Sequence, residues 1–180
     1  MQVFWGRQAV FLCYNEVMRW LQDKKQAIVV GALIYDDSED LCRVFLAKRA
    51  NGRKFLPGVY EIPSGRVSYG EKLERGLERQ IKEKLHVDIE VEEPIAVFDY
   101  LDRDNNVHAV QVIYLARLRG AEPKEITLRK NKHSESIWIS QPAMERVLGE
   151  MKESFPEEYA AVARGLGIVE EKKKRRTKKD

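Results

Sequence analysis

The sequence predicts an α+β domain in which strands lie before and after one central helix, and further helices follow near the end of the chain. Two observations lead to this prediction. Several runs are rich in β-branched residues or alternate apolar with polar residues, as strands do, whereas one central stretch has the apolar spacing of a helix. A length of 180 residues suffices for a single domain, since chains of this size bury roughly 70% of their unfolded surface. We therefore expect strands on both sides of a helix rather than a regular βαβ alternation.

The N-terminal part of the chain, residues 1–25, is predicted to be a helical extension. Within residues 8–23 the apolar side chains recur every three or four positions, which is typical of an amphipathic helix. Its apolar side either packs on the domain's own sheet or forms a homodimer contact with Trp5 and Trp20. The apolar positions are Val10, Cys13, Tyr14, Val17, Met18, Trp20 and Leu21.

The first strands are predicted to form a hairpin. Residues 27–35 are a β-branched run, residues 36–40 are acidic and polar, and residues 42–48 alternate behind them. A basic loop over 48–54 follows, and residues 58–63 supply a short strand.

The central stretch, residues 65–87, is predicted to be a loop that leads into one helix. Apolar residues fall at four-residue intervals and form the buried side of this helix. Gln80, Glu83 and Lys84 are three and four residues apart and share another side of the same helix. The helix therefore carries both a core contact and a polar cluster. The apolar positions are Leu73, Leu77, Ile81 and Leu85.

The second half of the chain is predicted to contain more strands and two helices. Strands are expected over 87–92, 95–101 and 107–117, with a turn at 102–106 between the last two. After a loop at 119–131 we expect a strand over 136–140. Ser140 is a plausible N-cap for a helix that ends at Met151, and Pro156 opens a last helix to about Gly165.

Basic residues are concentrated at the C-terminus. Residues 170–180 hold seven Lys or Arg against three acids, a net charge of +4, so residues 1–169 carry −1 of the overall +3. We expect a body over 26–168 and a disordered basic tail over 169–180, because blocks of like charge resist folding. The run Lys172–Lys179 is either a solvated tail or a salt-sensitive RNA contact.

Composition excludes several classes of protein. No apolar run reaches the roughly 20 residues that span a bilayer, and the N-terminus lacks the basic opening of a secretory signal. We therefore expect a cytoplasmic protein that makes no membrane contact. Cys13 and Cys42 are too few for a disulfide framework and have no metal-ligand spacing.

Residues 58–87 resemble the Nudix box and its lead-in. The box has Gly, five residues, Glu, seven residues and then Arg-Glu-hydrophobic-any-Glu-Glu-any-Gly-hydrophobic. Three positions depart from it: Gln80 and Lys84 replace carboxylates, and His86 replaces the closing Gly. The matching positions are Gly65, Glu71, Arg79, Ile81, Glu83 and Val87.

The resemblance implies a Nudix fold over about residues 27–152, with a mixed β-sheet sandwiched between helices. It also implies hydrolysis of a nucleoside diphosphate linked to another group, by attack of water on the phosphoanhydride with Mg²⁺ or Mn²⁺. The catalytic residues would be Glu83, Glu71 and Arg79, of which the last two are largely structural. Glu83 and Gln80 would be the metal ligands.

A further segment, Lys132-His-Ser-Glu135, resembles one in which the family often has an acid directly before His-Ser-Glu. With Gln80 and Lys84, three expected carboxylates are then replaced at one predicted site. A Lys offers no acceptor to a metal, and an amide is neutral. Either the residues have drifted or the metal chemistry is weak, altered or lost.

Two classes of function follow. The first is a divalent-metal pyrophosphohydrolase that uses a replacement acid, for which Asp102, Glu122 and Glu125 are examples. The second is a catalytically inactive protein that binds a nucleotide or RNA without a metal, in which lysines and arginines hold the phosphates. The candidate ligand-binding residues are Lys84, Lys132, Arg49 and Arg53. Phe55 and Tyr60 flank the box entry and either stack on a base or, as aromatic residues there more often do, belong to the core.

Overall fold

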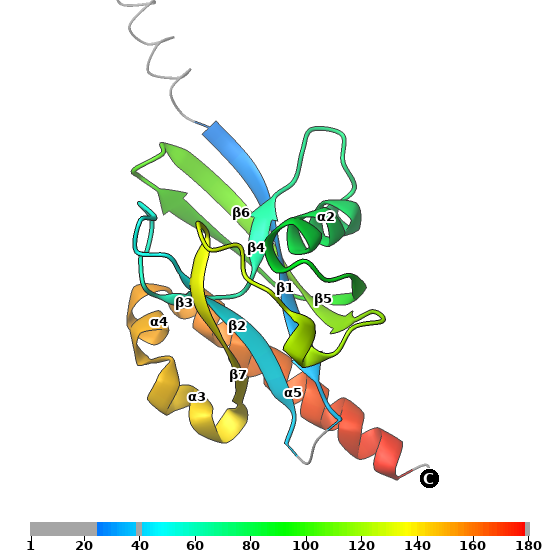
Figure 1. The fold of residues 1–180 in the computed structure, drawn as a ribbon. Helices are drawn as coiled ribbons and strands as arrows, with labels where there is room; N and C mark the ends of the chain where they lie inside the picture. The colour runs from blue at the N-terminus through cyan, green and yellow to red at the C-terminus, as the bar shows by residue number, and fades with distance from the viewer. Residues whose placement is uncertain (1–24, 39–40, 179–180) are drawn as a thin grey trace, which may run out of the picture.

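The computed structural model describes residues 25–38 and 41–178. Their strands form one mixed sheet, and helices cover both of its faces (Figure 1). This arrangement confirms the α+β prediction and the expected sandwich of a mixed sheet between helices. The predicted N-terminal helix and its possible dimer contact lie outside the described residues.

The sheet is organised around its central strand, β1 (Lys25–Asp36). β1 runs parallel to β6 (Val107–Leu118), which pairs antiparallel with β5 (Ile89–Asp102). On its other edge, β1 pairs with β4 (Ser64–Arg66) near its start and with β2 (Arg43–Arg49) at its end. The pairing of β1 with β2 confirms the predicted hairpin.

Two further strands complete the sheet beside β2. β3 (Tyr60–Glu61) and β7 (His133–Ser140) both pair antiparallel with β2. The main path of the sheet is β3-β2-β1-β6-β5. Because β4 and β2 use different parts of one edge of β1, residues 60–66 pass from one part of the sheet to the other.

One face of the sheet is covered by α2 (Leu73–Leu85), as the spacing predicts. Leu77, Ile81 and Leu85 are fully buried against the strands. The helix begins two residues later than Glu71, because Glu71 N–H still donates to the carbonyl of Ser68 in a turn.

The other face is covered by α5 (Pro156–Thr177), with α3 (Gln141–Val147) and α4 (Gly149–Ser154) beside it (Figure 1). A short 3-10 turn, η1 (Pro123–Glu125), lies in the loop before β7. α5 crosses the sheet closely at Gly165, where a Cβ atom would lie 2.1 Å from Leu33 Cδ2. The buried residues Val162, Leu166 and Val169 complete this side of the core.

Two helix predictions are corrected. The helix expected up to Met151 is two helices, since the backbone at Leu148 leaves the helical region between α3 and α4. The last helix does not stop at Gly165, and the expectation of disorder from residue 169 is wrong as far as Thr177. The physical reason is charge pairing: Lys172 lies 2.6 Å from Glu92, and Arg176 lies 2.7 Å from Asp37. In the described part of the chain, no helix is long and apolar enough to cross a membrane.

Candidate functional site

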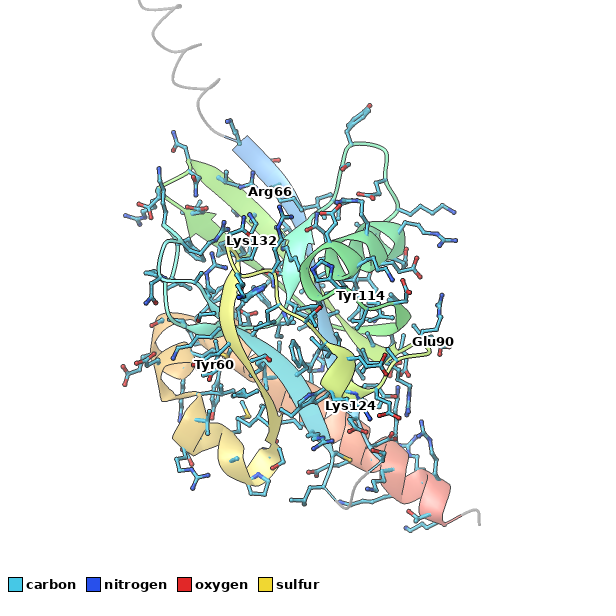
Figure 2. The ribbon with its side chains drawn as sticks, viewed as in Figure 1. Tyr60, Arg66, Glu90, Tyr114, Lys124 and Lys132 are labelled. Carbon is cyan, nitrogen blue, oxygen red and sulfur yellow. The ribbon has the colours of Figure 1, made fainter. Side chains whose placement is uncertain are left out.

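The main cavity of the described structure, about 690 Å³ in volume, lies where α2, the segment from β3 to β4, β5 and the start of α5 meet. Figure 2 labels three of its residues: Tyr60 on β3, Arg66 on β4 and Lys132 just before β7. All the candidate ligand-binding residues line this cavity, as do Gln80 and Glu83 on α2. The lining of the cavity includes Arg49, Arg53, Phe55, Glu61, Ser64, Gly65, Gln80, Glu83, Lys84, Tyr100, Asp102, Gln111, Arg129, Lys132, His133 and Glu158.

Glu61 forms the centre of a buried ionic group. It pairs with Arg49, and its Oε1 lies 2.9 Å from Nε2 of His133. Burial alone would raise the pKa of Glu61, but the hydrogen bond from His133 and the charge of Arg49 outweigh burial and hold the pKa below its usual value. Glu61 is therefore a fixed negative charge on the cavity wall.

Glu158, from the first turn of α5, is a second buried carboxyl group. The backbone N–H of Ile62 donates to its Oε1 at 2.7 Å. Burial raises the pKa of Glu158 to about 8, and the nearby charge of Glu61 adds to this effect. At pH 7 Glu158 is therefore mainly a neutral carboxylic acid that can donate its proton.

Lys84 extends from α2 towards the same segment and donates to the carbonyl oxygen of Ser64. Burial lowers the pKa of Lys84 to about 8. Repulsion from Lys132, Arg53 and Arg49 adds to this shift, whereas the negative charge of Glu61 opposes it. The ammonium group is still mostly protonated at pH 7. It is held inside the cavity and does not extend into solvent.

Four successive residues, 61–64, are thus attached to five different elements. Glu61 reaches β2 and β7, and Ile62 reaches α5. The carbonyl of Pro63 accepts from Ala32 N–H of β1 at 2.9 Å, and that of Ser64 accepts from Lys84 of α2. This segment, which we call the anchored segment, fixes the floor of the cavity.

Apart from Lys54 and Arg66, four basic residues of the cavity have no carboxylate partner among the ion pairs of the described residues: Lys84, Lys132, Arg53 and Arg129. We call them the cavity cations. Burial lowers the pKa of Lys132, and repulsion from Arg53 and Arg129 adds to the shift. An anion that entered the cavity would relieve this mutual repulsion.

Glu71 and Arg79 lie outside the residues that line the cavity and form a bidentate pair. Arg79 Nε donates to Glu71 Oε1 at 2.8 Å, and Nη2 donates to Oε2 at 2.7 Å. The hydrogen bonds from Arg79 and from Ser68 N–H lower the pKa of Glu71 to about 2. The pair holds the loop before α2 against the helix.

Glu83 lines the cavity near its opening, and its side chain is 49% exposed. Arg79 Nη1 lies 3.4 Å from its Oε1. Gln80 donates from Nε2 to the carbonyl of Arg66 at 3.2 Å. A Cβ atom on Gly65 would lie 2.0 Å from Gln80 Oε1, so the glycine is required for this close approach.

The donor set on this helix does not fit a divalent cation. Glu83 is one carboxylate, the amide of Gln80 is engaged with the backbone, and the ammonium group of Lys84 repels a metal. Among residues 25–38 and 41–178, no group of three or more His, Cys, Asp or Glu side chains is placed to hold a metal ion.

The acids considered as replacements are mostly used elsewhere. Asp102 lines the cavity, but its carboxylate accepts from Asn105 N–H at 3.1 Å and from Asn105 Nδ2 at 2.7 Å. Glu122 and Glu125 form a capping box at η1, away from the residues that line the cavity.

Sequence reasoning missed several residues of the cavity, among them Glu158, His133 and Gln111. Glu158 had a detectable signal, because it lies three and four positions before buried Ala161 and Val162 and so places an acid on the apolar side of a helix. In the described part of the chain, Gln111 Nε2 and His133 Nδ1 are buried without a hydrogen-bond partner. Both atoms can bind a polar ligand.

An aromatic wall closes one side of the cavity. Phe55 stacks on Tyr100 with ring centroids 5.5 Å apart, and Phe155 meets Tyr100 edge-on at 5.3 Å. Tyr60 also lines the cavity, but its hydroxyl donates to Glu135 at 3.0 Å. The cavity therefore combines an apolar aromatic side with a basic side.

Comparison with known proteins assigns the family. The model of the NUDIX domain matches residues 25–159, which is most of the chain. The chain belongs to the NUDIX family. This match confirms the resemblance seen in residues 58–87.

Individual relatives agree with this NUDIX assignment. The ADP-ribose pyrophosphatase of Methanocaldococcus jannaschii is 29% identical over 98 residues, which are 54% of this chain and 54% of that protein. The match thus spans about half the length of this curated relative. A MutT NUDIX hydrolase from Burkholderia pseudomallei is 28% identical, with a TM-score of 0.55 over 65% of this chain and 84% of that one.

Two more distant structures share the fold. The MutT protein from Methanosarcina mazei Go1 has a TM-score of 0.62 and 17% identity over 79% of this chain and 96% of its own. An Ap4A hydrolase from C. elegans has a TM-score of 0.56 and 18% identity over 76% of this chain and 98% of its own.

Proposed function

We propose that this NUDIX protein binds a nucleoside-diphosphate-linked compound in the cavity without a metal ion, and that hydrolysis of the phosphoanhydride is weak or lost. The observation that supports this proposal is Lys84: a cation lies inside the cavity where the family pattern has a carboxylate. A buried ammonium group near other cations attracts phosphate directly and replaces the neutralising role of a metal.

In the proposed complex, the cavity cations contact the diphosphate. Lys84 and Lys132 act as point charges, whereas Arg53 and Arg129 offer planar, bidentate donors. The nucleobase packs on the aromatic wall beside Phe55, where stacking is worth about 1–3 kcal/mol per base. A relative named ADP-ribose pyrophosphatase makes ADP-ribose the first ligand to test.

A second candidate function is slow hydrolysis. Two acids of the cavity favour it: Glu83, whose carboxyl group lies near the opening, and Glu158, which can exchange a proton near pH 8. General acid–base catalysis alone typically contributes about 10²–10⁴-fold in rate, so residual turnover would be slow. Mg²⁺ or Mn²⁺ would be needed if the activity follows the family.

The discriminating experiment is calorimetric titration with ADP-ribose in the presence of a chelator, followed by a hydrolysis assay with Mg²⁺ and Mn²⁺. We expect binding in the chelator and little or no turnover. Binding that required the metal, together with turnover abolished by Glu83→Gln, would replace the proposal with the hydrolase function.

A complementary test restores the expected carboxylates by Gln80→Glu, Lys84→Glu and Lys132→Glu together. We expect this variant to lose chelator-resistant binding and to gain metal-dependent turnover. Gln80→Asn serves as the matched control, since it shortens the amide without adding charge. An RNA contact through Lys172–Lys179 stays a separate prediction, tested by salt-dependent binding of a single-stranded RNA.

A further inference from the structure

The face of the sheet that α2 covers continues beyond the helix as an exposed apolar surface. The strands present four large apolar side chains there: Ile28 is 51% exposed, Val97 is 67%, Leu101 is 60% and Val110 is 42%. Isolated exposed apolar residues are ordinary, but a contiguous group indicates a surface that another element covers.

The strand register brings these side chains together. Ile28 of β1 pairs with Val110 of β6, and Val110 pairs with Asp99 of β5. Val97 and Leu101 lie two positions on either side of Asp99, so all of these residues point to the same face. Ile28 and Val110 also line a hollow of about 320 Å³. We call Ile28, Val97, Leu101 and Val110 the apolar sheet face.

The chain itself reaches the edge of this face. Lys25 is the first described residue, begins β1 and donates from its N–H to the carbonyl of Asn106 at 3.0 Å. It lies three residues before Ile28, which is about 10 Å along a strand. The 24 residues that precede Lys25 lie outside the described structure. They join the described chain at Lys25, near the edge of the apolar sheet face.

The sequence of that segment predicts an apolar helix side that is long enough to cover the apolar sheet face. Residues 8–23 carry the apolar spacing of one helix side, which needs a cover. A helix of this length would extend about 24 Å, whereas Val97 to Leu101 spans about 13 Å and three strands about 10 Å. Gln22, Asp23 and Lys24 leave room for the short turn that a helix-to-strand connection needs.

We propose that residues 8–23 of this chain dock as an amphipathic helix on the apolar sheet face of the same molecule. The short connection to β1 keeps the segment at a high effective concentration near the face, which favours docking within one molecule over docking on a second copy. The sheet is then covered on this face by two helices, α2 and the N-terminal one.

The test is a paramagnetic relaxation measurement on the full chain with a spin label on Cys13, in a Cys42→Ala background that leaves one thiol. We expect the amide signals of Val97 and Val110 to lose more than half of their intensity. In the double variant Val97→Asp with Leu101→Asp, the amide signals of the unsubstituted residues of β5 and β6, Val110 among them, should regain their intensity. Val147→Asp, at an apolar residue of α3 that is 37% exposed, is the matched control and should restore nothing.

Two results would overturn the proposal. Signals of β5 and β6 that keep their full intensity would mean that the segment does not cover this face. The second result comes from mixing spin-labelled protein with isotope-labelled protein that carries no spin label. If the amide signals of β5 and β6 lost intensity only in this mixture, a second copy would cover the face. Val97, Leu101 and Val147 are exposed, so their variants should fold, whereas Cys42 is buried; an unchanged spectrum of the α5 core would verify that the Cys42→Ala background and the variants all fold.

Discussion

The two ends of the sheet handle positive charge in opposite ways. At the far end, Lys172 pairs with Glu92 at 2.6 Å and with Glu93 at 2.8 Å. Asp37 likewise accepts two hydrogen bonds from Arg117 at 3.0 Å and one from Arg176 at 2.7 Å. We call these residues the paired cluster: Asp37, Glu92, Glu93, Arg117, Lys172 and Arg176.

At the cavity end, the four cavity cations have no carboxylate partner in the described ion pairs, and burial and mutual repulsion lower the pKa values of Lys84 and Lys132. A charge that serves the fold alone is better placed beside an opposite charge, as in the paired cluster. Repulsion that is kept in the free protein can be relieved only by a ligand. The contrast therefore locates the anion-binding region without any appeal to family roles.

The largest effect is expected from substitutions that reverse the charge of lysines and arginines at each end of the sheet. We expect Lys84→Glu with Lys132→Glu to weaken ADP-ribose binding in a chelator by about 100-fold or more, since each lost charged contact is worth about 1.5–3 kcal/mol. The matched variant Lys172→Glu with Arg176→Glu should leave the dissociation constant unchanged and lower the melting temperature. Calorimetry and thermal unfolding measure the two effects. Equal losses of binding from both variants would refute the contrast.

A smaller effect is expected from the glycine that lets Gln80 approach the backbone. Gly65→Ala places a methyl group on the amide of Gln80, so we expect a loss of about 1–3 kcal/mol in the free energy of unfolding. Gly149→Ala, where the methyl group would meet no atom within 4 Å, is the control and should be neutral or slightly stabilising. Urea unfolding compares the variants, and similar curves for both would contradict the close contact.

The third prediction concerns pH. Above pH 8 Lys84 loses its charge and Glu158 gains one, because the pKa of each is about 8. Both changes disfavour an anion, so affinity should fall about tenfold or more between pH 7 and pH 9. Lys84→Arg keeps its charge over this range and Glu158→Gln cannot ionise. The double variant should therefore bind with little dependence on pH, and a decline equal to that of the wild type would mean that other groups cause it.

The smallest effect lies at the end of α2, at a position where the sequence departs from the box without touching the cavity. His86 has φ of 59°, a left-handed conformation that costs a residue with a side chain about 1–2 kcal/mol. We expect His86→Gly to stabilise the protein by up to about 1 kcal/mol and to leave ligand binding unchanged. Chemical unfolding and calorimetry verify this, and destabilisation would show that the His86 side chain makes a useful contact.

The strands and α2 could be predicted from sequence because their signals are local. Alternation in residues 27–35 and four-residue spacing from Leu73 to Leu85 depend on one face of one element being buried. The extension of α5 to Thr177 could not be predicted in this way. It depends on Glu92 of β5 and on Asp37, directly after β1, which neutralise Lys172 and Arg176 only after folding.

The candidate site likewise has a part that local sequence signals predict and a part that only the folded structure shows. The box pattern located α2, and the cavity does bring Gln80, Lys84 and Lys132 together. The pattern contains no information on Glu158, since α5 lies outside the box and reaches the cavity only by crossing the opposite face of the sheet. A buried carboxyl group that stays protonated at pH 7 is a property of the folded surroundings, and composition cannot reveal it.

The anchored segment, residues 61–64, bears on how the specificity of this protein can change. Its five contacts run to β2, β7, α5, β1 and α2, so the floor of the cavity is held independently of the loops at its opening. The loops over 50–58 and 119–131 can therefore accumulate substitutions, or change length, at little cost to the floor. Substitutions in these loops can therefore change which ligand is bound while the anchored segment and the sheet keep their structure.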